Sequence, residues 1–301
     1  MLKKILLGVV VLVVVIVVAV GSYAGVQISR FNASMDKVYD VPLPVVTRST
    51  DAAVLARGKH LVGAIGACSS RLCHGSDLGG GPTTEMGPVM AFAAPNITSA
   101  NLGAAYSDGE LARLIRYGVK KDGRSVAFMP SQDFAWLPDA DVLAIVSYVR
   151  TVPAVERPCG STVVRPLGKV LDRKDAMILD VARRLAAAPV DMAPAPTPTA
   201  AYGAYVSRLC KGCHGEGLSG GPLPGAPPSI PTPLNLTPDA SGLKEWSFED
   251  FDRLMRHGIR KNGKTLDPFM PIEAWGQLDD VEMHALWAYL SSLPPTSFGH
   301  R

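Results

Sequence analysis

Residues 210–215 read Cys210-Lys-Gly-Cys213-His214-Gly215, and residues 68–75 read Cys68-Ser-Ser-Arg-Leu-Cys73-His74-Gly75. The stretch at 210–215 contains C-x-x-C-H, the pattern at which a c-type haem is attached. Two thiols add to the haem vinyl groups as thioethers, and the adjacent histidine supplies its imidazole as an axial iron ligand. The two related stretches predict two covalently bound c-type haems, with His74 and His214 as iron ligands.

Each of these stretches is followed by a methionine at nearly the same interval. Met129 lies 55 residues after His74, Met270 lies 56 residues after His214, and both stand in the sequence Phe-Met-Pro. A thioether sulfur opposite a histidine gives a low-spin iron suited to carrying electrons, and it raises the reduction potential. We therefore expect Met129 and Met270 to complete the two iron coordination spheres.

Further matches between the two copies show that the whole segment is duplicated. Asn96-Ile-Thr98 matches Asn235-Leu-Thr237, and Leu114-Ile-Arg116-Tyr-Gly118 matches Leu254-Met-Arg256-His-Gly258. The repeat is far longer than a solenoid unit and indicates two duplicated domains. We divide the chain into a transmembrane anchor (1–28), a tether (29–50), haem domain 1 (51–153), a linker (154–198) and haem domain 2 (199–301). The apolar spacing within the linker predicts a possible amphipathic helix over residues 167–188.

Helix signals also repeat at matching positions. Ser107 is expected to cap a helix over residues 108–117, with Glu110 completing a capping box, and Ser247 with Asp250 repeats the pattern. Gly118 and Gly258 are natural helix stops. Closing helices are expected over residues 139–151 and 279–292, whereas residues 75–103 should form a loop.

Two arginines occupy the same place in the two copies. Arg116 and Arg256 lie near the ends of the expected helices. Each is a candidate for a hydrogen bond to a haem propionate, which would tune the reduction potential. The alternative for both is an ordinary solvated helix arginine.

The N-terminus carries an uncharged apolar run over residues 5–20, behind Lys3 and Lys4. Extended to Ile28, the run is long enough to cross about 30 Å of hydrocarbon as a helix. The lysines would stay in the cytoplasm, which places the rest of the chain outside. A cleaved signal peptide is the alternative, with Ser22-Tyr-Ala24 as a weak cleavage site. Either segment delivers the haem domains to the periplasm.

Charge and cysteine content narrow the possible functions. The net charge is +3, but residues 51–153 carry nine basic and nine acidic side chains, and residues 199–301 carry nine and eleven. Without a basic stripe on either domain, we expect no nucleic-acid binding. Four of the five cysteines belong to the haem motifs. The fifth, Cys159, is a free linker thiol, an iron ligand or an intermolecular disulfide partner.

The order of the motifs resembles the membrane-anchored multihaem cytochrome c subunits of periplasmic alcohol, aldehyde and sugar-acid dehydrogenases, and dihaem class I cytochromes c generally. The resemblance rests on a series of short motifs in the same order: Arg57-Gly58, Cys-His-Gly, Asn96-Ile-Thr98, Tyr106-Ser107, Asp122-Gly123, Met129-Pro130 and the second copy with Trp246-Ser247. It covers most of residues 51–153 and 199–293. The resemblance implies an all-α fold, with two tandem class I cytochrome c domains after an N-terminal transmembrane helix. It also implies thioethers and iron ligands at Cys68, Cys73, His74, Met129, Cys210, Cys213, His214 and Met270.

The first motif departs from the family pattern. Four residues separate Cys68 from Cys73, where the family has two, and Ser70 stands where the usual first cysteine would be. The first haem is therefore held either by both cysteines or by Cys73 alone. The approach Ala64-Ile-Gly-Ala-Cys68 favours Cys68, with the longer loop bulging from the haem edge. Subunits of this family also often carry three haems, and this chain encodes two.

The sequence thus predicts a single-pass dihaem cytochrome of a bacterial inner membrane, with its haem domains in the periplasm. It would carry single electrons from a dehydrogenase or quinol-oxidising complex to a soluble cytochrome or terminal oxidase. The alternative is a dihaem redox enzyme of the peroxidase or thiosulfate-oxidising type. An enzyme of that type needs one open or weakly held iron position, which the paired Met-Pro motifs disfavour.

Overall fold

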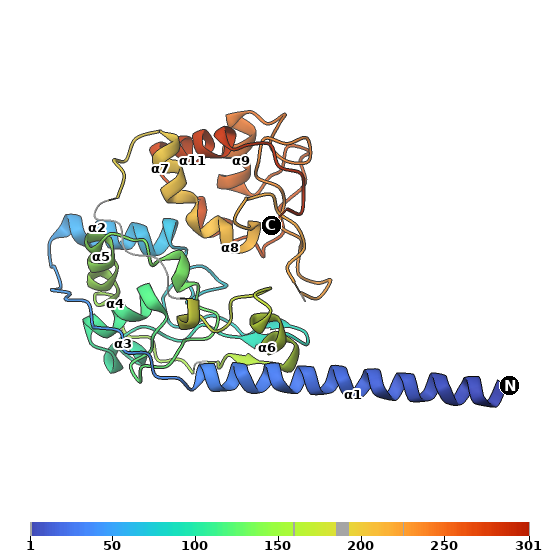
Figure 1. Ribbon diagram of the computed structural model, residues 1–301. Coiled ribbons are helices and arrows are strands. Elements are labelled where there is room, and N and C mark those ends of the chain that lie inside the picture. The colour runs from blue at the N-terminus through green and yellow to red at the C-terminus, as the bar shows by residue number, and fades with distance from the viewer. Residues whose placement is uncertain (1, 159, 185–192, 225, 301) are drawn as a thin grey trace.

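The computed structural model describes residues 2–158, 160–184, 193–224 and 226–300. A long helix, α1 (Leu2–Met35), projects from a body made of two helical domains stacked on one another (Figure 1). The first domain contains α2 (Ala52–His60), a π-helical turn (Leu61–Ile65), α3 (Leu102–Ala105), α4 (Asp108–Tyr117), a 3₁₀ turn (Ser131–Asp133) and α5 (Asp139–Val149). The second contains α7 (Ala200–Val206), a 3₁₀ turn (Ser207–Leu209), α8 (Cys210–His214), α9 (Phe248–His257), α10 (Ile272–Trp275) and α11 (Asp280–Ser292).

The repeated helix signals act as the sequence predicts. Ser107 and Glu110 form the capping box of α4, and Ser247 and Asp250 form that of α9. Each helix ends at a left-handed glycine, Gly118 with φ 61° and Gly258 with φ 67°. Only glycine adopts this conformation without steric cost, which explains why it recurs at this position.

A close helix crossing holds each domain together. Helix α2 packs on α5 at Gly58, where a methyl group would lie 2.0 Å from the carbonyl oxygen of Ala144. Helix α7 packs on α11 at Gly203, where it would lie 1.9 Å from the carbonyl oxygen of Ala285. No other residue fits, because any Cβ would penetrate the opposite backbone.

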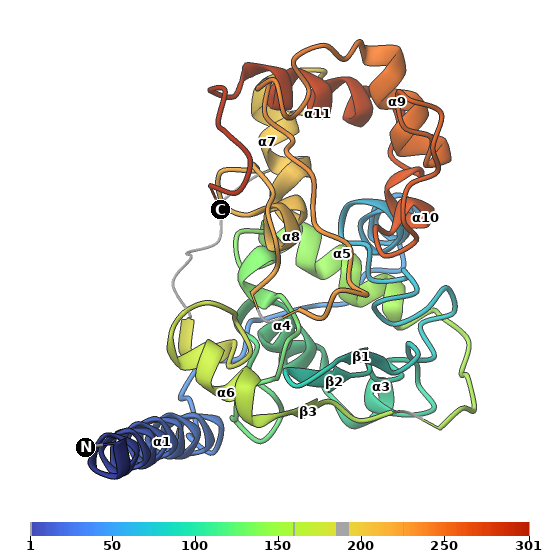
Figure 2. The ribbon, with the colours of Figure 1, turned by 90° about the vertical axis from the view of Figure 1, so that its right-hand side faces the viewer.

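The two domains lie one above the other (Figure 2), and they share one apolar core. The core joins Leu61, Val146, Trp136, Tyr205 and Leu286, all less than 5% exposed, with further residues of both domains. Trp136 of the first domain meets Tyr205 of the second edge to face, with ring centroids 4.5 Å apart. The interface between the domains is therefore packed like a domain interior.

The segment between the domains contains more structure than a linker. Strand β3 (Val163–Val164) pairs with β2 (Met90–Phe92), which pairs with β1 (Thr84–Met86) in an antiparallel sheet. Helix α6 (Pro166–Arg173) follows and packs on α1. The mainly helical architecture is confirmed, and this small sheet is an addition to it. Part of the loop expected over residues 75–103 is strand, because β1 and β2 pair with each other and residues 163–164 pair with β2.

The helix expected over residues 167–188 is shorter than the apolar pattern suggested. Helix α6 ends at Arg173, and a turn through Asp175, with φ 59°, leads to a 3₁₀ turn at Ala182–Arg184. Residues 185–188 of the expected helix lie outside the described residues, as does Cys159. The turn forms because Asp172 accepts hydrogen bonds from the amides of Leu179 and Asp180, at 2.9 and 3.0 Å. A local side-chain acceptor thus replaces the helical partners of those amides.

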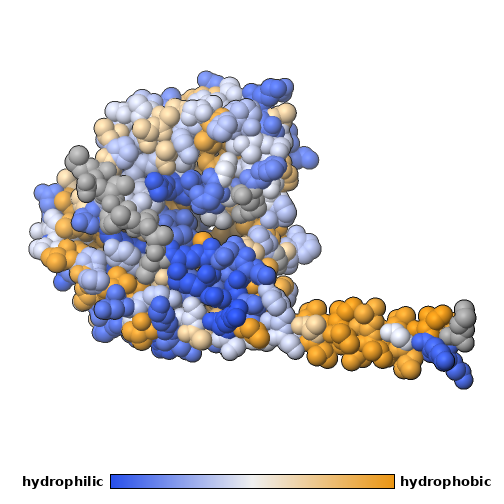
Figure 3. Space-filling model, viewed as in Figure 1, coloured by the Kyte–Doolittle hydropathy of each residue, from blue (hydrophilic) through white to orange (hydrophobic). Residues whose placement is uncertain are grey.

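Among the described residues, α1 is the helix that is long and apolar enough to cross a membrane, and most of it stands clear of the body as an apolar rod (Figure 3). Its last turns are not free. Gln27 and Phe31 are buried, with Phe31 inside a small core that includes Met90 and Leu179. The following residues are tied to the first domain, since the amide of Tyr39 donates to the carbonyl of Gly123 at 2.8 Å.

We predict that Gly58→Ala lowers the thermal unfolding midpoint of the haem-loaded protein. The added methyl would overlap the Ala144 carbonyl, and overpacking of this kind costs about 1–3 kcal/mol. Gly63→Ala is the matched control, since a methyl there meets only the Gln277 side chain at 3.4 Å. Circular dichroism melting of the two variants compares them, and equal melting temperatures would contradict this account of the crossing.

Candidate haem sites

The two histidines of the cysteine–histidine stretches are held in the same way. Nδ1 of His74 donates to the carbonyl oxygen of Pro95 at 2.7 Å, and Nδ1 of His214 donates to that of Leu234 at 2.7 Å. Because a carbonyl can only accept, the proton is on Nδ1, and Nε2 carries the lone pair. Burial lowers the pKa of His74, so its imidazole is neutral. Both histidines are therefore prepared to bind a metal through Nε2.

The acceptor carbonyls sit at matched places because the loops beyond them are built alike. Oδ1 of Asn96 accepts from the amide of Thr98 at 2.9 Å, and Oδ1 of Asn235 accepts from that of Thr237 at 2.9 Å. These turns follow Pro95 and Leu234 directly, and all four side chains are buried. The repeated Asn-x-Thr motif thus fixes the carbonyl that orients the histidine.

The four motif cysteines lie in two pairs, and none of them forms a disulfide. Burial raises the pKa of Cys68 to about 12, with a smaller contribution from nearby Cys73. The pKa of Cys210 is raised to about 12 by burial and, secondarily, by Cys213. Each pair therefore keeps two neighbouring thiols beside its histidine, which suits two thioether bonds to one haem.

The two extra residues of the first motif are taken up in a loop. In the first domain, the amide of His74 donates to the carbonyl of Cys68 at 2.9 Å, six residues earlier. The second motif is the short helix α8, in which the amide of Gly215 donates to Lys211. In the first motif, Gly75 instead reaches back five residues, to Ser70, at 3.1 Å. The carbonyl of Cys68, rather than that of Ser70, therefore accepts from the amide of the histidine.

The two methionines lie in identical turns. The amide of Ser131 donates to the carbonyl of Met129 at 2.8 Å, and that of Ile272 donates to Met270 at 2.8 Å. The proline between has φ −79° and ψ 57° in the first copy, and −78° and 68° in the second. These are the angles of an inverse γ-turn, whose φ proline sets in advance. Both methionines are partly buried and pack on the core that Cys68 also contacts.

Arg116 and Arg256 have protein partners in the structure. Arg116 is 2% exposed and donates to the carbonyl of Ala135 at 3.3 Å and to Asp139 at 2.5 Å. Arg256 donates to the carbonyl of Leu278 at 3.1 Å and to Asp280 at 2.7 Å. Each thus ties α4 or α9 to the start of the closing helix. Contact with a haem propionate stays a prediction for both.

The cysteine loop of each domain touches the methionine segment of the other. Arg71, between Cys68 and Cys73, donates its amide to Glu273 at 3.1 Å and its side chain to the carbonyl of Pro268 at 3.0 Å. These two residues flank Met270. In the other direction, Asp133, four residues after Met129, faces Gly212 of the second motif. A Cβ added to Gly212 would lie 3.3 Å from Oδ2 of Asp133. Each cysteine loop therefore abuts the methionine segment of the other domain.

A buried polar network follows the same pseudo-twofold relation. His60, two residues after Gly58, donates to Glu282 of the other domain at 2.7 Å. Tyr205, two residues after Gly203, donates to Asp141 of the other domain. Asp141 and Glu282 each stand three residues before the alanine at their helix crossing. Such self-complementary contacts are typical of a twofold interface.

His60, Asp279 and Glu282 also bring together three possible metal ligands, with ligand atoms within 4.8 Å of one another. The possible ligand atoms of these residues already take part in hydrogen bonds within the protein. Asp279 and Glu282 form the capping box of α11, and Glu282 accepts from His60 and from Tyr202. We therefore assign this group to the interface.

Comparison with known proteins accounts for the duplicated geometry. The sequence model of the family Cytochrome c matches residues 55–153 and again residues 200–294. The chain belongs to the cytochrome c family. Two domains of this family carry two covalently bound c-type haems, and the carbonyl-oriented histidines and paired thiols described above suit that cofactor. The predicted fold, with two cytochrome c domains after an N-terminal apolar helix, is confirmed.

Several relatives of this dihaem cytochrome c are cytochrome subunits of dehydrogenases. The cytochrome c subunit of a quinone alcohol dehydrogenase from Gluconacetobacter polyoxogenes is 40% identical over 94 residues, which are 29% of this chain and 20% of that protein. The gluconate 2-dehydrogenase cytochrome c subunit of Pantoea cypripedii is 37% identical over 94 residues, 29% and 21% of the two chains. The fructose dehydrogenase cytochrome subunit of Gluconobacter japonicus is 33% identical over 109 residues, 32% and 22%. Each match spans about a fifth of the relative.

Sequence reasoning missed three parts of this cytochrome: the carbonyls of Pro95 and Leu234, the polar interface network, and the attachment of residues 163–184 to the first domain. The repeat held a signal for the first two. Pro95 and Leu234 directly precede the Asn-x-Thr motifs, and acidic residues recur at matching places in the closing helices. The attachment of residues 163–184 had no such signal, because this segment has no counterpart in the second copy.

We predict that the interface stability depends on pH through His60. Its hydrogen bond to Glu282 raises the pKa of His60 above its ordinary value, so the stabilisation is fully present below about pH 6.5 and is lost as the pH rises through the higher folded-state pKa. His60→Gln should therefore lower the melting temperature most at low pH, by about 2–4 °C for each kcal/mol lost. The control is the exposed His257→Gln. If the difference in melting temperature between wild type and His60→Gln stays constant with pH, the interaction of His60 with Glu282 does not depend on protonation and the prediction is wrong.

We also predict that Cys68 forms a thioether. Cys68→Ala should leave a haem with one remaining vinyl group, and its pyridine haemochrome band should shift. Ser70→Ala, in the same loop, should leave the band in place. An unshifted Cys68→Ala spectrum would mean that the first haem is held by Cys73 alone.

Proposed function

We propose that this chain is a membrane-anchored electron-transfer cytochrome that serves a periplasmic dehydrogenase of the alcohol or sugar-acid type. It would receive single electrons from the dehydrogenase or a quinol-oxidising complex and deliver them to a soluble cytochrome or terminal oxidase. The observation that carries the proposal is the duplicated site, in which both histidines are oriented by a carbonyl and both methionines lie in the same proline turn. The relatives that are dehydrogenase subunits supply the partner class.

In this proposal Cys68, Cys73, Cys210 and Cys213 attach the haems, while His74 with Met129 and His214 with Met270 hold the two irons. Bound haem iron supplies reversible one-electron chemistry. The protein fixes the ligands so that little rearranges when the charge changes. The Pro95 and Leu234 carbonyls hold the imidazoles, and Pro130 and Pro271 hold the methionine turns.

The interface favours one two-haem unit over two independent carriers. Both cysteine loops contact the methionine segment of the other domain, and the shared core leaves no flexible joint in the described contact. Fixed spacing between the haem-holding segments would let an electron received in one domain pass to the other without a diffusive encounter. The first domain also fixes the end of α1 through Phe31, which supports an uncleaved anchor close to the membrane.

A second candidate, a dihaem peroxidase or thiosulfate-oxidising enzyme, needs an iron position open to substrate. Turns of the same geometry at Met129 and Met270 support six-coordinate iron in both domains. We therefore favour electron transfer.

The function can be tested on full-length chain isolated from its own membranes. We expect it to remain in membranes washed with high salt, to enter detergent, and to co-purify with a dehydrogenase. An alcohol, an aldehyde and a sugar acid are then added in separate experiments. We expect one of these substrate classes to reduce both haems. Dithionite-reduced protein should bind no carbon monoxide, because both irons keep their methionine.

Carbon monoxide binding at half of the haem together with peroxide turnover would favour the enzyme. A mature chain starting near Gly25 in the soluble periplasmic fraction would show that α1 is cleaved. Met270→Ala is the internal reference for six-coordination, since it should create carbon monoxide binding at one haem of two.

A further inference from the structure

The segment 163–184, which we call the strap, lies along the backbone that leads to Met129. The amide of Phe128 donates to the carbonyl of Leu179 at 3.2 Å, and Ala127 pairs with Asp180 as an antiparallel bridge. The amide of Ala182 donates to the hydroxyl of Ser125 at 2.9 Å. Four consecutive residues before the methionine segment, 125–128, are thus bonded to strap residues 179–182.

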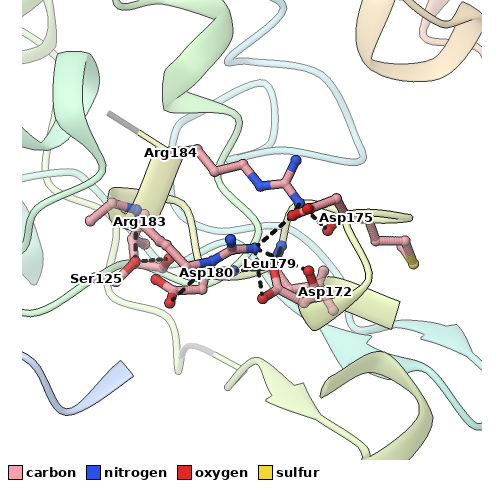
Figure 4. Close-up of polar contacts among 10 residues, drawn as sticks. Ser125, Asp172, Asp175, Leu179, Asp180, Arg183 and Arg184 are labelled. Carbon is pink, nitrogen blue, oxygen red and sulfur yellow. Dashed lines mark hydrogen bonds and ion pairs between the residues drawn. The ribbon is translucent and has the colours of Figure 1, made fainter. Parts of the chain in front are cut away.

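The strap is itself held by Asp172, as Figure 4 shows. This carboxylate is fully buried, and its Oδ1 accepts from the amides of Leu179 and Asp180 at 2.9 and 3.0 Å. Arg183 donates to its other oxygen at 3.3 Å. Asp175 lies in the same turn but is exposed, and it pairs with Arg183 and Arg184. Asp172 therefore presents the Leu179 carbonyl to Phe128, whereas Asp175 only bridges surface arginines.

Phe128 needs this support because its backbone is left-handed, with φ 68°, a region that side chains with a Cβ rarely adopt. Its ring lies 4.6 Å from that of Phe92, between ring centroids, beside the fully buried Leu179. Release of the strap would remove both the amide partner and one wall of the pocket around the ring. The residue directly before Met129 would then be free to relax.

The second domain is built differently at the same place. Phe269 has no left-handed backbone, and the amide of Met270 donates to Asp267 at 3.1 Å. Among the described residues, no backbone–backbone hydrogen bond joins residues 265–270 to a segment outside their own domain. The hydrogen bond they receive from the first domain comes from the Arg71 side chain, which donates to the carbonyl of Pro268 at 3.0 Å. The same Phe-Met-Pro sequence is thus preceded by a backbone ladder in one domain and by a single side-chain contact in the other.

We propose that the strap is a positioning element for Met129, so that the first haem keeps its methionine more firmly than the second keeps Met270. This rests on the proposed ligation by Met129 and Met270. An external ligand enters the iron site only when the methionine has left, so its apparent affinity falls with the fraction of open sites. Asp172 and Ser125 act through the strap and touch no iron ligand.

The experiment titrates imidazole into the oxidised full-length protein in detergent and follows the methionine-to-iron charge-transfer band. The wild type should lose the band in two equal phases, with apparent dissociation constants separated by about tenfold or more. Met270→Ala should remove the tighter phase and leave the weaker one, which assigns the weaker phase to the first haem. Met129→Ala should do the opposite.

In the Met270→Ala background, Asp172→Ala should release the strap and increase the imidazole affinity of the first haem by about tenfold, the change expected when the hydrogen bond from Phe128 to Leu179 is lost. Ser125→Ala removes a single acceptor from the strap and should give a several-fold increase. Asp175→Asn is the matched control and should change nothing, because asparagine tolerates the left-handed backbone there. If Asp172→Ala fails to incorporate haem, Ser125→Ala decides the question.

Two results would overturn the proposal: a single phase in the wild type, or an unchanged first-haem affinity in both Ser125→Ala and a haem-loaded Asp172→Ala. A different result would overturn the ligation instead. If Met129→Ala keeps the whole charge-transfer band, Met129 is not an iron ligand, whatever the strap does.

Discussion

Direct contact between two helix backbones sets the geometry of each haem domain. Gly58 lies on the carbonyl of Ala144, and Gly203 lies on that of Ala285, so the opening and closing helices cross with no side chain between them. A crossing this close fixes the rotation of both helices about their axes. It therefore decides which neighbouring side chains face outward, toward the other domain, and every contact of the interface depends on it.

The interface built on these crossings is symmetric in position but not in charge. Asp141 is paired with Arg57 of its own domain and accepts from Tyr205 of the other. At the equivalent position, Glu282 accepts hydrogen bonds from Tyr202 of its own domain and from His60 across the interface. A buried carboxylate is costly unless it is paired. One carboxylate thus has a permanent cation, while the charge partner of the other depends on the protonation of a histidine.

The sequence alone was enough to predict what is repeated and local. Cysteine and histidine spacing, capping boxes such as Ser107 with Glu110, and the glycine stop at Gly118 are short-range features, and each recurs in the second copy. The methionine turns are equally local, because proline fixes the φ angle that each turn requires. The ligand assignments themselves stay predictions.

What could not be predicted depends on tertiary contact within one copy. The apolar pattern of residues 167–188 favours a helix, but Asp172 captures the amides of Leu179 and Asp180 and turns the chain back. Strand β3 forms because β2 offers it an edge, which no propensity of Val163 and Val164 reveals. Comparing the two copies cannot help where the second copy has no counterpart.

The strap (residues 163–184) also joins the segment before Met129 to α1. Phe31 of α1, Leu179 of the strap, and Phe128 beside Met129 belong to one small core, which Phe92 of β2 completes. Packed interiors transmit displacement because they contain little free volume. In the first domain, the residue directly before Met129 is therefore packed into the same core as the end of α1. The Phe-Met-Pro segment of the second domain is not part of that core, although both domains carry the same motifs.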